Sequence, residues 1–549
     1  MKKEYVLFVI SCLFSLFLMN VYGNFELGHD QSRHANDGEL WYYYFQGYGS
    51  KEFSSYDEFI TSFPEFSRSK IAWYFMYDPP LHALLTAASY TFFGINEFAA
   101  RLPSQLLHIL GIFFLFLLSK EFTSEKNALL IAFLYGSIPL VFHLGRDAMI
   151  DAGAASFLIG WMYFSFFLSS TYGNYKKYIC FAAGGLSLSA AILTKYTALL
   201  FFVGFLPVYG AYVLWSSYRS EKRFFSLRMR ELMGCISIQL ILLVIVSYPW
   251  VSYSWFTGGT LEKLAPVRTE NWTQHGYVYN VFYLFYELII ESVGFFALLL
   301  FLFLRRGLFQ EKHAPLLSYI IATLFVVPLY FSNIQPRYFL AVFAFVSIII
   351  FILVMDIFSE KNAQRLFFGY TCIFLFISLT LSYLVLHGNG QIDTTGFDTT
   401  FSTVHGSALF FGYYGNFDTV DIVSGPNILA VKSWGQYWSA YFFEQRSLFN
   451  IELTSQNHYA NPDLFMFRFF QKLETHPEIG FVYLSSAELQ GEYGSDVLQI
   501  MNSTKNSIPT YFIVPNTNTG EEYQAMEIFL VGVDTQKYSY VYWDFYEVK

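Results

Sequence analysis

The chain has 549 residues, of which 54% are hydrophobic and 14% are charged. Soluble domains carry about 25% charged residues, so this composition excludes an ordinary soluble protein and indicates one that spans a lipid bilayer. The net charge of −9 says little about partners, and nothing in the sequence resembles the basic footprint of a nucleic-acid-binding protein. The four cysteines lie in apolar segments, which leaves no disulfide framework and no cysteine-based metal site. They are Cys12, Cys180, Cys235 and Cys372.

Eleven apolar segments approach the ~20 residues that a membrane-spanning helix needs. They are 5–22, 102–118, 128–144, 154–169, 178–193, 198–215, 232–250, 282–304, 316–331, 338–355 and 366–386. The first resembles a signal peptide but has no clear cleavage site, so we interpret it as a retained span. A further apolar segment, 79–93, is too short to span. We expect it to form a helix that lies at the outer membrane interface.

The basic residues of the loops predict the orientation of these spans. If the N-terminus is cytoplasmic, alternate loops should be rich in lysine and arginine. Alternate loops are indeed basic. Their basic residues are Lys120 and Lys126; Lys176 and Lys177; Arg219, Lys222, Arg223, Arg228 and Arg230; Arg305, Arg306 and Lys312; and Lys361 and Arg365. The pattern therefore predicts eleven spans with the N-terminus inside and the C-terminus outside.

Two long segments then lie outside the membrane, a loop over 23–100 and a tail over 389–549. The tail gains Asn, Asp, Thr, Gly and Pro. It contains short β-type runs at 428–432, 480–484, 510–514 and 526–531. Helix-like stretches lie between them, at 463–473 and 495–501. This alternation predicts a small extracytoplasmic α/β domain after a transmembrane domain over 1–388.

Ionisable residues gather in several stretches that the topology brings to the outer face of the membrane. Such residues at a membrane are candidates for function. The stretches contain His29 to Glu39, Asp78 to His82, Glu97 to Arg101, Arg146 to Asp151, Lys195, and Arg337. The spacing of His29, His34 and His82 matches no standard metal motif. We therefore assign no metal site, although a divalent ion stays an alternative.

Four of these stretches carry a resemblance. Pro79-Pro80-Leu81 is followed by a Glu-Phe-x-x-Arg-Leu-Pro-Ser string over 97–104, then by Gly-Arg-x-x-x-x-Asp over 145–151 and Thr-Lys at 194–195. In this order the strings resemble the GT-C glycosyltransferases of the protein O-mannosyltransferase and aminoarabinose-transferase superfamily. The resemblance covers about residues 1–390 and is most specific from Pro79 to Lys195. The tail shows no comparable motif.

Members of that superfamily transfer a sugar from a polyprenyl-phosphate carrier to an acceptor outside the cytoplasm, and a first-loop aspartate is their catalytic carboxylate. The resemblance implies that Asp30 is this residue. The family's next acidic residue is Gln31 here, and a lysine that some members carry before Pro-Pro is Asp78. Specificity for lipid A or aminoarabinose therefore does not carry over. We expect an inverting hexosyl- or pentosyltransferase in the cell (inner or plasma) membrane, whose acceptor is a glycan, a lipid or a protein.

Cations beside the leaving phosphate should stabilise the charge that it gains as the glycosidic bond breaks. The candidates for this role are Arg146, Lys195 and Arg337. The supporting candidates are Asp151, Arg33, His34, Asp78, Glu97 and Arg101. Structural roles stay open for several of these side chains: Lys195 and Arg337 suit the membrane interface, and Glu97 with Arg101 forms an i,i+4 pair at a helix start.

Two other classes of protein remain as alternatives. A secondary transporter is disfavoured by the odd number of spans, the large outer loop, the polar tail and the lack of repeats with broken helices. A non-catalytic membrane scaffold with a partner-binding tail is the other class, and the absence of an acidic residue after Asp30 keeps it open. Transfer of a sugar from a polyprenyl-phosphate donor separates both alternatives from a glycosyltransferase.

Overall fold

The structure is a computed structural model, and the residues that it describes are 3–21, 29–51, 58, 78–95, 97–171, 175–221, 227–256, 311–326, 336–387 and five strands between 428 and 531. Among these residues, seven helices are long and apolar enough to cross a membrane, or eight if one bent pair is a single span. The chain is therefore a polytopic helical membrane protein.

The seven helices coincide with predicted spans. They are α6 (Glu97–Lys120), α9 (Ile150–Met162) with its π-helical continuation η1 (Tyr163–Leu168), α11 (Tyr175–Thr194), α12 (Thr197–Glu221), α13 (Leu227–Phe256), α18 (Leu340–Ile357) after the turn η5 (Pro336–Phe339), and α19 (Glu360–His387). The short helix α10 (Ser169–Thr171) follows η1.

The other predicted spans have less complete counterparts. The first forms α1 (Lys3–Val21), whose apolar part runs from Phe8 to Asn20. The segment 316–331 follows η2 (Glu311–His313), and its first part forms α17 (Ala314–Ile321) and η3 (Ala322–Val326). The segment 282–304 lies outside the described residues. The total of eleven spans and their orientation stay predictions.

The predicted span over 128–144 is bent. It consists of α7 (Glu125–Ser137) and α8 (Pro139–Arg146), whose axes meet at 72°. Pro139 has no N–H to continue the hydrogen-bond ladder, and its ring disfavours a helical residue before it. Ile138 accordingly has φ −53° and ψ 126°, and the chain leaves the helix there.

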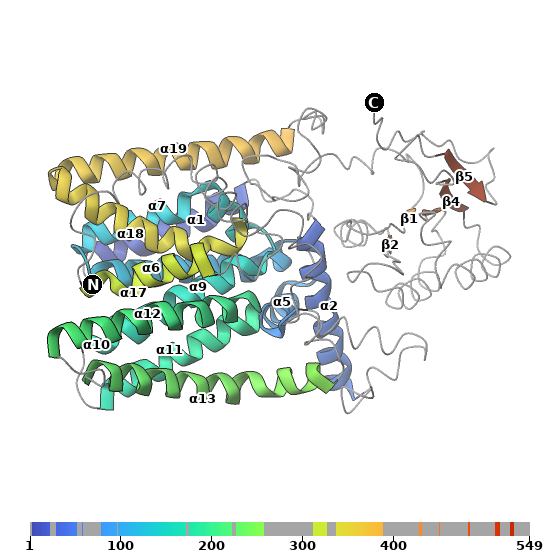
Figure 1. The fold of residues 1–549 in the computed structure, drawn as a ribbon. Coiled ribbons are helices and arrows are strands. Elements are labelled where there is room, and N and C mark those ends of the chain that lie inside the picture. The colour runs from blue at the N-terminus through green and yellow to red at the C-terminus, as the bar shows by residue number, and fades with distance from the viewer. Residues whose placement is uncertain are drawn as a thin grey trace.

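Two helices lie across one end of the bundle, the end at which α13 and α19 stop (Figure 1). They are α2 (His29–Ser50) and α5 (Pro80–Phe93), and they pack on each other. Their approach is close: a Cβ on Gly38 would lie 2.4 Å from Cγ2 of Thr86. The phenol of Tyr90 also donates a hydrogen bond to the carbonyl of Ala35 at 3.2 Å. As predicted, α5 is a helix too short to count as a span.

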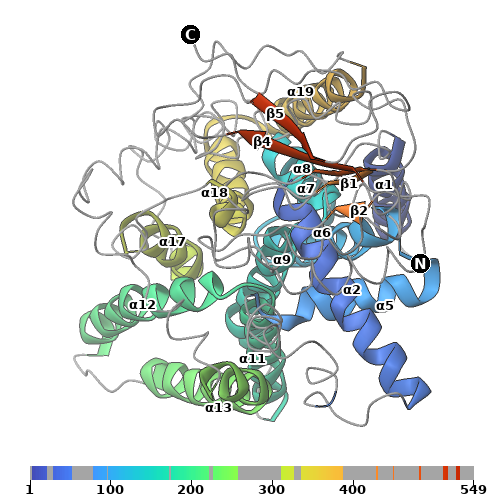
Figure 2. The ribbon, with the colours of Figure 1, turned by 90° about the vertical axis from the view of Figure 1, so that its right-hand side faces the viewer.

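The core lies between the helices and reflects where each one sits. Helix α18 is apolar around its whole circumference and is almost entirely buried, as a central helix should be. Trp161 of α9 is fully buried, and its ring meets those of Phe202 and Phe205 edge-to-face. Helices at the periphery instead expose large apolar side chains, such as Ile245 of α13 and Phe376 of α19, which suits contact with lipid. Figure 2 shows α12, α13 and α19 at the outside of the bundle.

Three basic loops meet at the opposite end of the bundle. Lys126 donates a hydrogen bond to Gln364 at 3.2 Å, and Asn127 donates one to Glu360 at 2.9 Å. Lys312 contacts the backbone carbonyl of Glu121. The loops around 120–127, 311–313 and 358–364 therefore share one side, as the charge pattern requires.

The five strands in the tail form one sheet. They are β1 (Ile428–Ala430), β2 (Phe449–Asn450), β3 (Phe481–Tyr483), β4 (Tyr511–Asn516) and β5 (Glu527–Val531), in the order β2-β1-β3-β4-β5. The first four are parallel and β5 is antiparallel to β4. Parallel neighbours need long crossover connections, which favours the predicted α/β arrangement. The predicted helices over 463–473 and 495–501 lie outside the described residues.

Candidate active site

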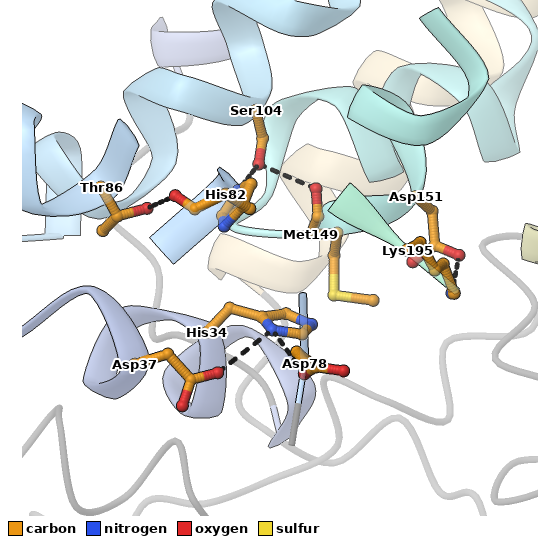
Figure 3. Close-up of polar contacts among 9 residues, drawn as sticks. All are labelled: His34, Asp37, Asp78, His82, Thr86, Ser104, Met149, Asp151 and Lys195. Carbon is orange, nitrogen blue, oxygen red and sulfur yellow. Dashed lines mark hydrogen bonds and ion pairs between the residues drawn. The ribbon is translucent and has the colours of Figure 1, made fainter. Parts of the chain in front are cut away.

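Ionisable side chains from six segments meet at the end of the bundle that α2 and α5 cover (Figure 3). The segments are α2, the residues before α5, α5 itself, the start of α6, the start of α9 and the turn between α11 and α12. Most of these side chains are buried, which raises the cost of leaving any charge without a partner. The predicted gathering of separate sequence stretches at one end is thus observed for the described residues.

Asp151 and Lys195 form the central ion pair. Asp151 lies in the first turn of α9 and is 3% exposed, and its Oδ1 atom accepts a hydrogen bond from Lys195 Nζ. The ammonium of Lys195 also lies 4.3 Å from the ring centroid of Tyr338, and the guanidinium carbon of Arg337 lies 5.6 Å from the same ring. Two cations therefore flank one aromatic ring. The second oxygen of Asp151 is buried and has no hydrogen-bond partner among the described residues.

Arg146 pairs with the residue that follows it in the sequence. It ends α8, and its Nε atom donates to Oδ1 of Asp147 at 3.2 Å, with both side chains 1% exposed. Gln105 of α6 donates to the backbone carbonyl of Arg146 at 3.3 Å. Asp151 thus pairs with Lys195, the other pocket cation, and Asp147 neutralises Arg146. The two ion pairs share no residue.

His34, Asp37 and Asp78 form a second charged group, on the α2 side. His34 Nδ1 lies 3.4 Å from Oδ2 of Asp78 and 3.8 Å from Oδ2 of Asp37. The three-residue step from His34 to Asp37 puts both on one face of α2, and Asp78 reaches them from the segment that precedes α5. The ring of His34 meets the ring of His82 edge-to-face with a centroid distance of 5.8 Å.

His82 lies beside the ring of His34 and begins a chain of two hydrogen bonds. Its Nε2 atom lies 2.8 Å from Ser104 Oγ, and the Ser104 hydroxyl donates to the carbonyl of Met149 at 2.9 Å. Burial lowers the pKa of His82 to about 4, and the nearby carboxylate of Asp151 opposes this shift only in part. The ring is therefore neutral at pH 7. Because α5 carries His82, this chain connects the helix across the bundle end to Ser104 of α6 and to the N-cap residue of α9.

The remaining predicted residues are placed less fully. Arg101 is buried in the second turn of α6. Asp30 and Arg33 lie in the first turn and a half of α2, and Glu97 begins α6; their side chains lie outside the described part of the structure. The structure therefore describes the roles of neither Asp30 nor Glu97.

Several side chains of this region were not singled out from the sequence. They are Asp37, Ser104, Gln105, Asp147 and Tyr338. Asp37 carried a usable signal, because it lies seven residues after Asp30 and three after His34, which is the repeat of one helical face. Such a signal depends on expecting a helix there, and the polar, aromatic composition of 29–50 gave none.

Comparison with known proteins agrees with the resemblance found in the sequence. A family model described as dolichyl-phosphate-mannose-protein mannosyltransferase matches residues 77–252, about a third of the chain. The crystal structure of ArnT from Cupriavidus metallidurans in the apo state superposes with a TM-score of 0.56, at 14% identity, over 93% of this chain and 92% of that chain. The same protein bound to undecaprenyl phosphate gives a TM-score of 0.54, at 14% identity, over 93% of both chains. No curated protein sequence matches the chain.

These matches confirm the superfamily resemblance, since residues 77–252 contain the motifs from Pro79 to Lys195. The fold is that of a polytopic GT-C membrane protein. Within that class, ArnT is a solved structure that the chain resembles over most of its length.

Proposed function

We propose that the protein is an inverting membrane glycosyltransferase that moves a hexose or pentose from a polyprenyl-phosphate carrier to an extracytoplasmic glycan, lipid or protein. The family match over 77–252 supports the reaction class, and the ArnT structure with bound undecaprenyl phosphate supports a polyprenyl-phosphate ligand. The observation that carries the proposal is the buried Asp151–Lys195 pair with Arg337 beside it, at the bundle end that α2 covers.

The cations suit the leaving group. As the bond from the sugar C1 to the phosphate oxygen breaks, the polyprenyl phosphate takes the electron pair and gains one negative charge, so a fixed cation binds it more strongly in the transition state. Lys195 is 14% exposed at its side chain, and Arg337 is partly exposed. Arg146 is 1% exposed and paired with Asp147, so it would have to exchange partners to reach a phosphate. We therefore place Lys195 and Arg337 ahead of Arg146 as phosphate ligands.

The acceptor side needs a base. In a single displacement, the acceptor oxygen attacks C1 from the face opposite the phosphate and loses its proton to a carboxylate. We assign this carboxylate to Asp30. It lies four residues before His34 in α2, so both positions share one face of the helix. The ring of His34 meets His82 on α5, which supports the view that this face is turned to the site.

The test is transfer by the purified full-length chain in liposomes that contain polyprenyl phosphates bearing radiolabelled hexoses or pentoses. We expect release of free polyprenyl phosphate together with a labelled product. Asp30→Asn should abolish transfer without loss of expression, because an amide cannot accept the acceptor's proton. Glu125→Gln is the matched control: it also converts a carboxylate to an amide, in a pair with Lys120 at the opposite end of the bundle.

Variants of the cations separate donor binding from catalysis. Lys195→Gln and Arg337→Gln should reduce turnover by about 10²–10³, the usual effect of removing one donor to a developing charge. Arg146→Lys should retain more activity than Arg146→Ala, because it keeps a charge beside Asp147. Full transfer by Asp30→Asn, or no consumption of any polyprenyl-phosphate sugar by the wild type, would overturn the proposal; the second result would favour a scaffold or a transporter.

A further inference from the structure

The donor atoms of His34, Asp37 and Asp78 lie within 4.8 Å of one another. Two of the separations, 3.4 Å and 3.8 Å, join one ring nitrogen to two different carboxylates. Ligand atoms about 2.0–2.1 Å from a tetrahedral Zn²⁺ lie roughly 3.3–3.4 Å apart. A single proton on Nδ1 can be shared well with one carboxylate only, whereas an ion between the three atoms contacts all of them. The spacing therefore suits a metal ion better than a hydrogen bond.

His82 supplies an independent observation. Ser104 has one hydroxyl proton and donates it to the carbonyl of Met149, so its oxygen must accept the hydrogen bond from His82 Nε2. Because the Nε2 atom of His82 carries the proton, its Nδ1 atom has a bare lone pair. This atom is buried and has no hydrogen-bond partner among the described residues. Figure 3 shows it on the side of the ring that faces His34.

The position of His82 suits a fourth ligand. Its ring lies 5.8 Å from the ring of His34 between centroids, and two imidazoles bound to one tetrahedral ion lie about 5 Å apart by the same bond lengths. His82 is not one of the three residues whose ligand atoms lie within 4.8 Å of one another, so its ring has to move toward His34 to bind the same ion. Histidines that bind metals usually donate their other N–H to a second-shell acceptor, and Ser104 fills that position for His82.

Charge and enclosure point to the kind of ion. The exposed fractions of the side chains are 3% for His34, 12% for Asp37 and 17% for Asp78, so the candidate ligands are largely shielded from solvent. Two carboxylates balance the charge of one divalent cation. Two nitrogen donors favour Zn²⁺ over Mg²⁺ and Ca²⁺, which prefer shells made of oxygen.

We propose that His34, Asp37, Asp78 and His82 bind one Zn²⁺ ion and so fasten α2 to α5 and to the segment before it. Among the described residues, no other group of three or more His, Cys, Asp or Glu side chains has this spacing. The ion holds the helix that carries Asp30 at a fixed height over the bundle end. Its binding does not depend on the reaction that the protein catalyses.

The test is Zn²⁺ binding by the detergent-solubilised full-length protein after treatment with a chelator. Isothermal titration should give one ion per chain, and zinc-edge X-ray absorption should report two imidazole nitrogens and two oxygens. His34→Gln, Asp37→Asn and Asp78→Asn should each weaken binding at least tenfold, roughly the lower limit for loss of a supporting group at a metal site. Glu125→Gln again serves as the control and should bind as the wild type does.

His82→Gln and Ser104→Ala test the fourth ligand, since Ser104→Ala removes the acceptor that fixes the ring and leaves the other ligands intact. Both should weaken Zn²⁺ binding. Failure of the wild type to bind one Zn²⁺ would overturn the proposal, and the group would then be a protonated His34 between two carboxylates. Wild-type Zn²⁺ affinity in all three of His34→Gln, Asp37→Asn and Asp78→Asn would also overturn it. So would a zinc-edge absorption spectrum that shows no imidazole ligand. Loss of sugar transfer with normal Zn²⁺ binding would count against the proposed function alone.

Discussion

Removing the charge of Lys195 should destabilise the protein strongly, because it leaves the buried carboxylate of Asp151 without a cation. Asp151 is 3% exposed, and Lys195 is the cation that contacts it among the described residues. Loss of one partner of a buried ion pair costs about 3–5 kcal/mol. The side chain of Lys195 is 14% exposed, so some water reaches the site. We therefore expect Lys195→Met to cost an amount at the lower end of this range. A cost of about 3 kcal/mol lowers the folding equilibrium constant roughly a hundredfold.

The assay is unfolding by sodium dodecyl sulfate in mixed micelles, followed by the fluorescence of tryptophan, since Trp161 is fully buried. Lys120→Met provides the control. It makes the same change in a pair with Glu125 whose members are 23% and 25% exposed, joined at 2.9 Å, where the expected cost is below about 1 kcal/mol.

A double variant isolates the charge effect from lost packing. Asp151→Asn with Lys195→Met leaves no buried ion, so the double variant should be more stable than Lys195→Met by about 1–3 kcal/mol. If the double variant is as unstable as the sum of its two singles, or if Lys195→Met costs no more than Lys120→Met, Asp151 is not a buried anion held by Lys195.

Three further predictions concern packing, topology and the tail. Gly38→Ala should separate α2 from α5, since the new Cβ would lie 2.4 Å from a side-chain carbon of α5; we expect a stability loss of about 1–3 kcal/mol, typical of overpacking, in the same micelle assay. In a Cys372→Ser background, Tyr48→Cys should react with an impermeant thiol reagent in intact cells and Lys222→Cys only after permeabilisation; the reverse pattern would invert the orientation. Residues 390–549 should express as a soluble fragment with a cooperative thermal transition, and a fragment without one would argue against a separate domain.

The sequence predicted the membrane helices well, because their signal is local. A run of about 20 apolar residues has few alternatives to a spanning helix, and α6, α11 and α18 each contain a predicted segment. A short helix over 79–93 was also predicted, because the segment is too short to span and because a span there would put the later loops against the positive-inside rule; the structure has this helix as α5. Helix α2 was not predicted, because its buried face uses small residues such as Ala35 and Gly38, which produce no apolar periodicity.

The sequence predicted which residues lie in the candidate site better than it predicted which of them form ion pairs with each other. Topology is enough to bring Asp151, Lys195 and Arg337 to the same end of the bundle. Which cation meets which carboxylate depends on tertiary packing: Lys195 lies 44 residues from Asp151 and contacts it, whereas Arg146 lies five residues away and does not pair with it. No pattern of side chains could predict the hydrogen bond from Ser104 to the carbonyl of Met149, because its acceptor is a backbone atom.

The 72° bend between α7 and α8 sets how deep the site lies in the bilayer. At 1.5 Å per residue, α7 rises about 20 Å and α8 is about 12 Å long, but at this angle α8 advances only about 4 Å along the axis of α7. Arg146 therefore ends about 8 Å short of the level that a straight helix would reach. If α7 begins at the inner boundary of a hydrocarbon layer about 30 Å thick, the buried pair of Arg146 and Asp147 lies within that layer and not at its outer boundary. The thickness of the bilayer then determines how far below the headgroups this end of the bundle lies.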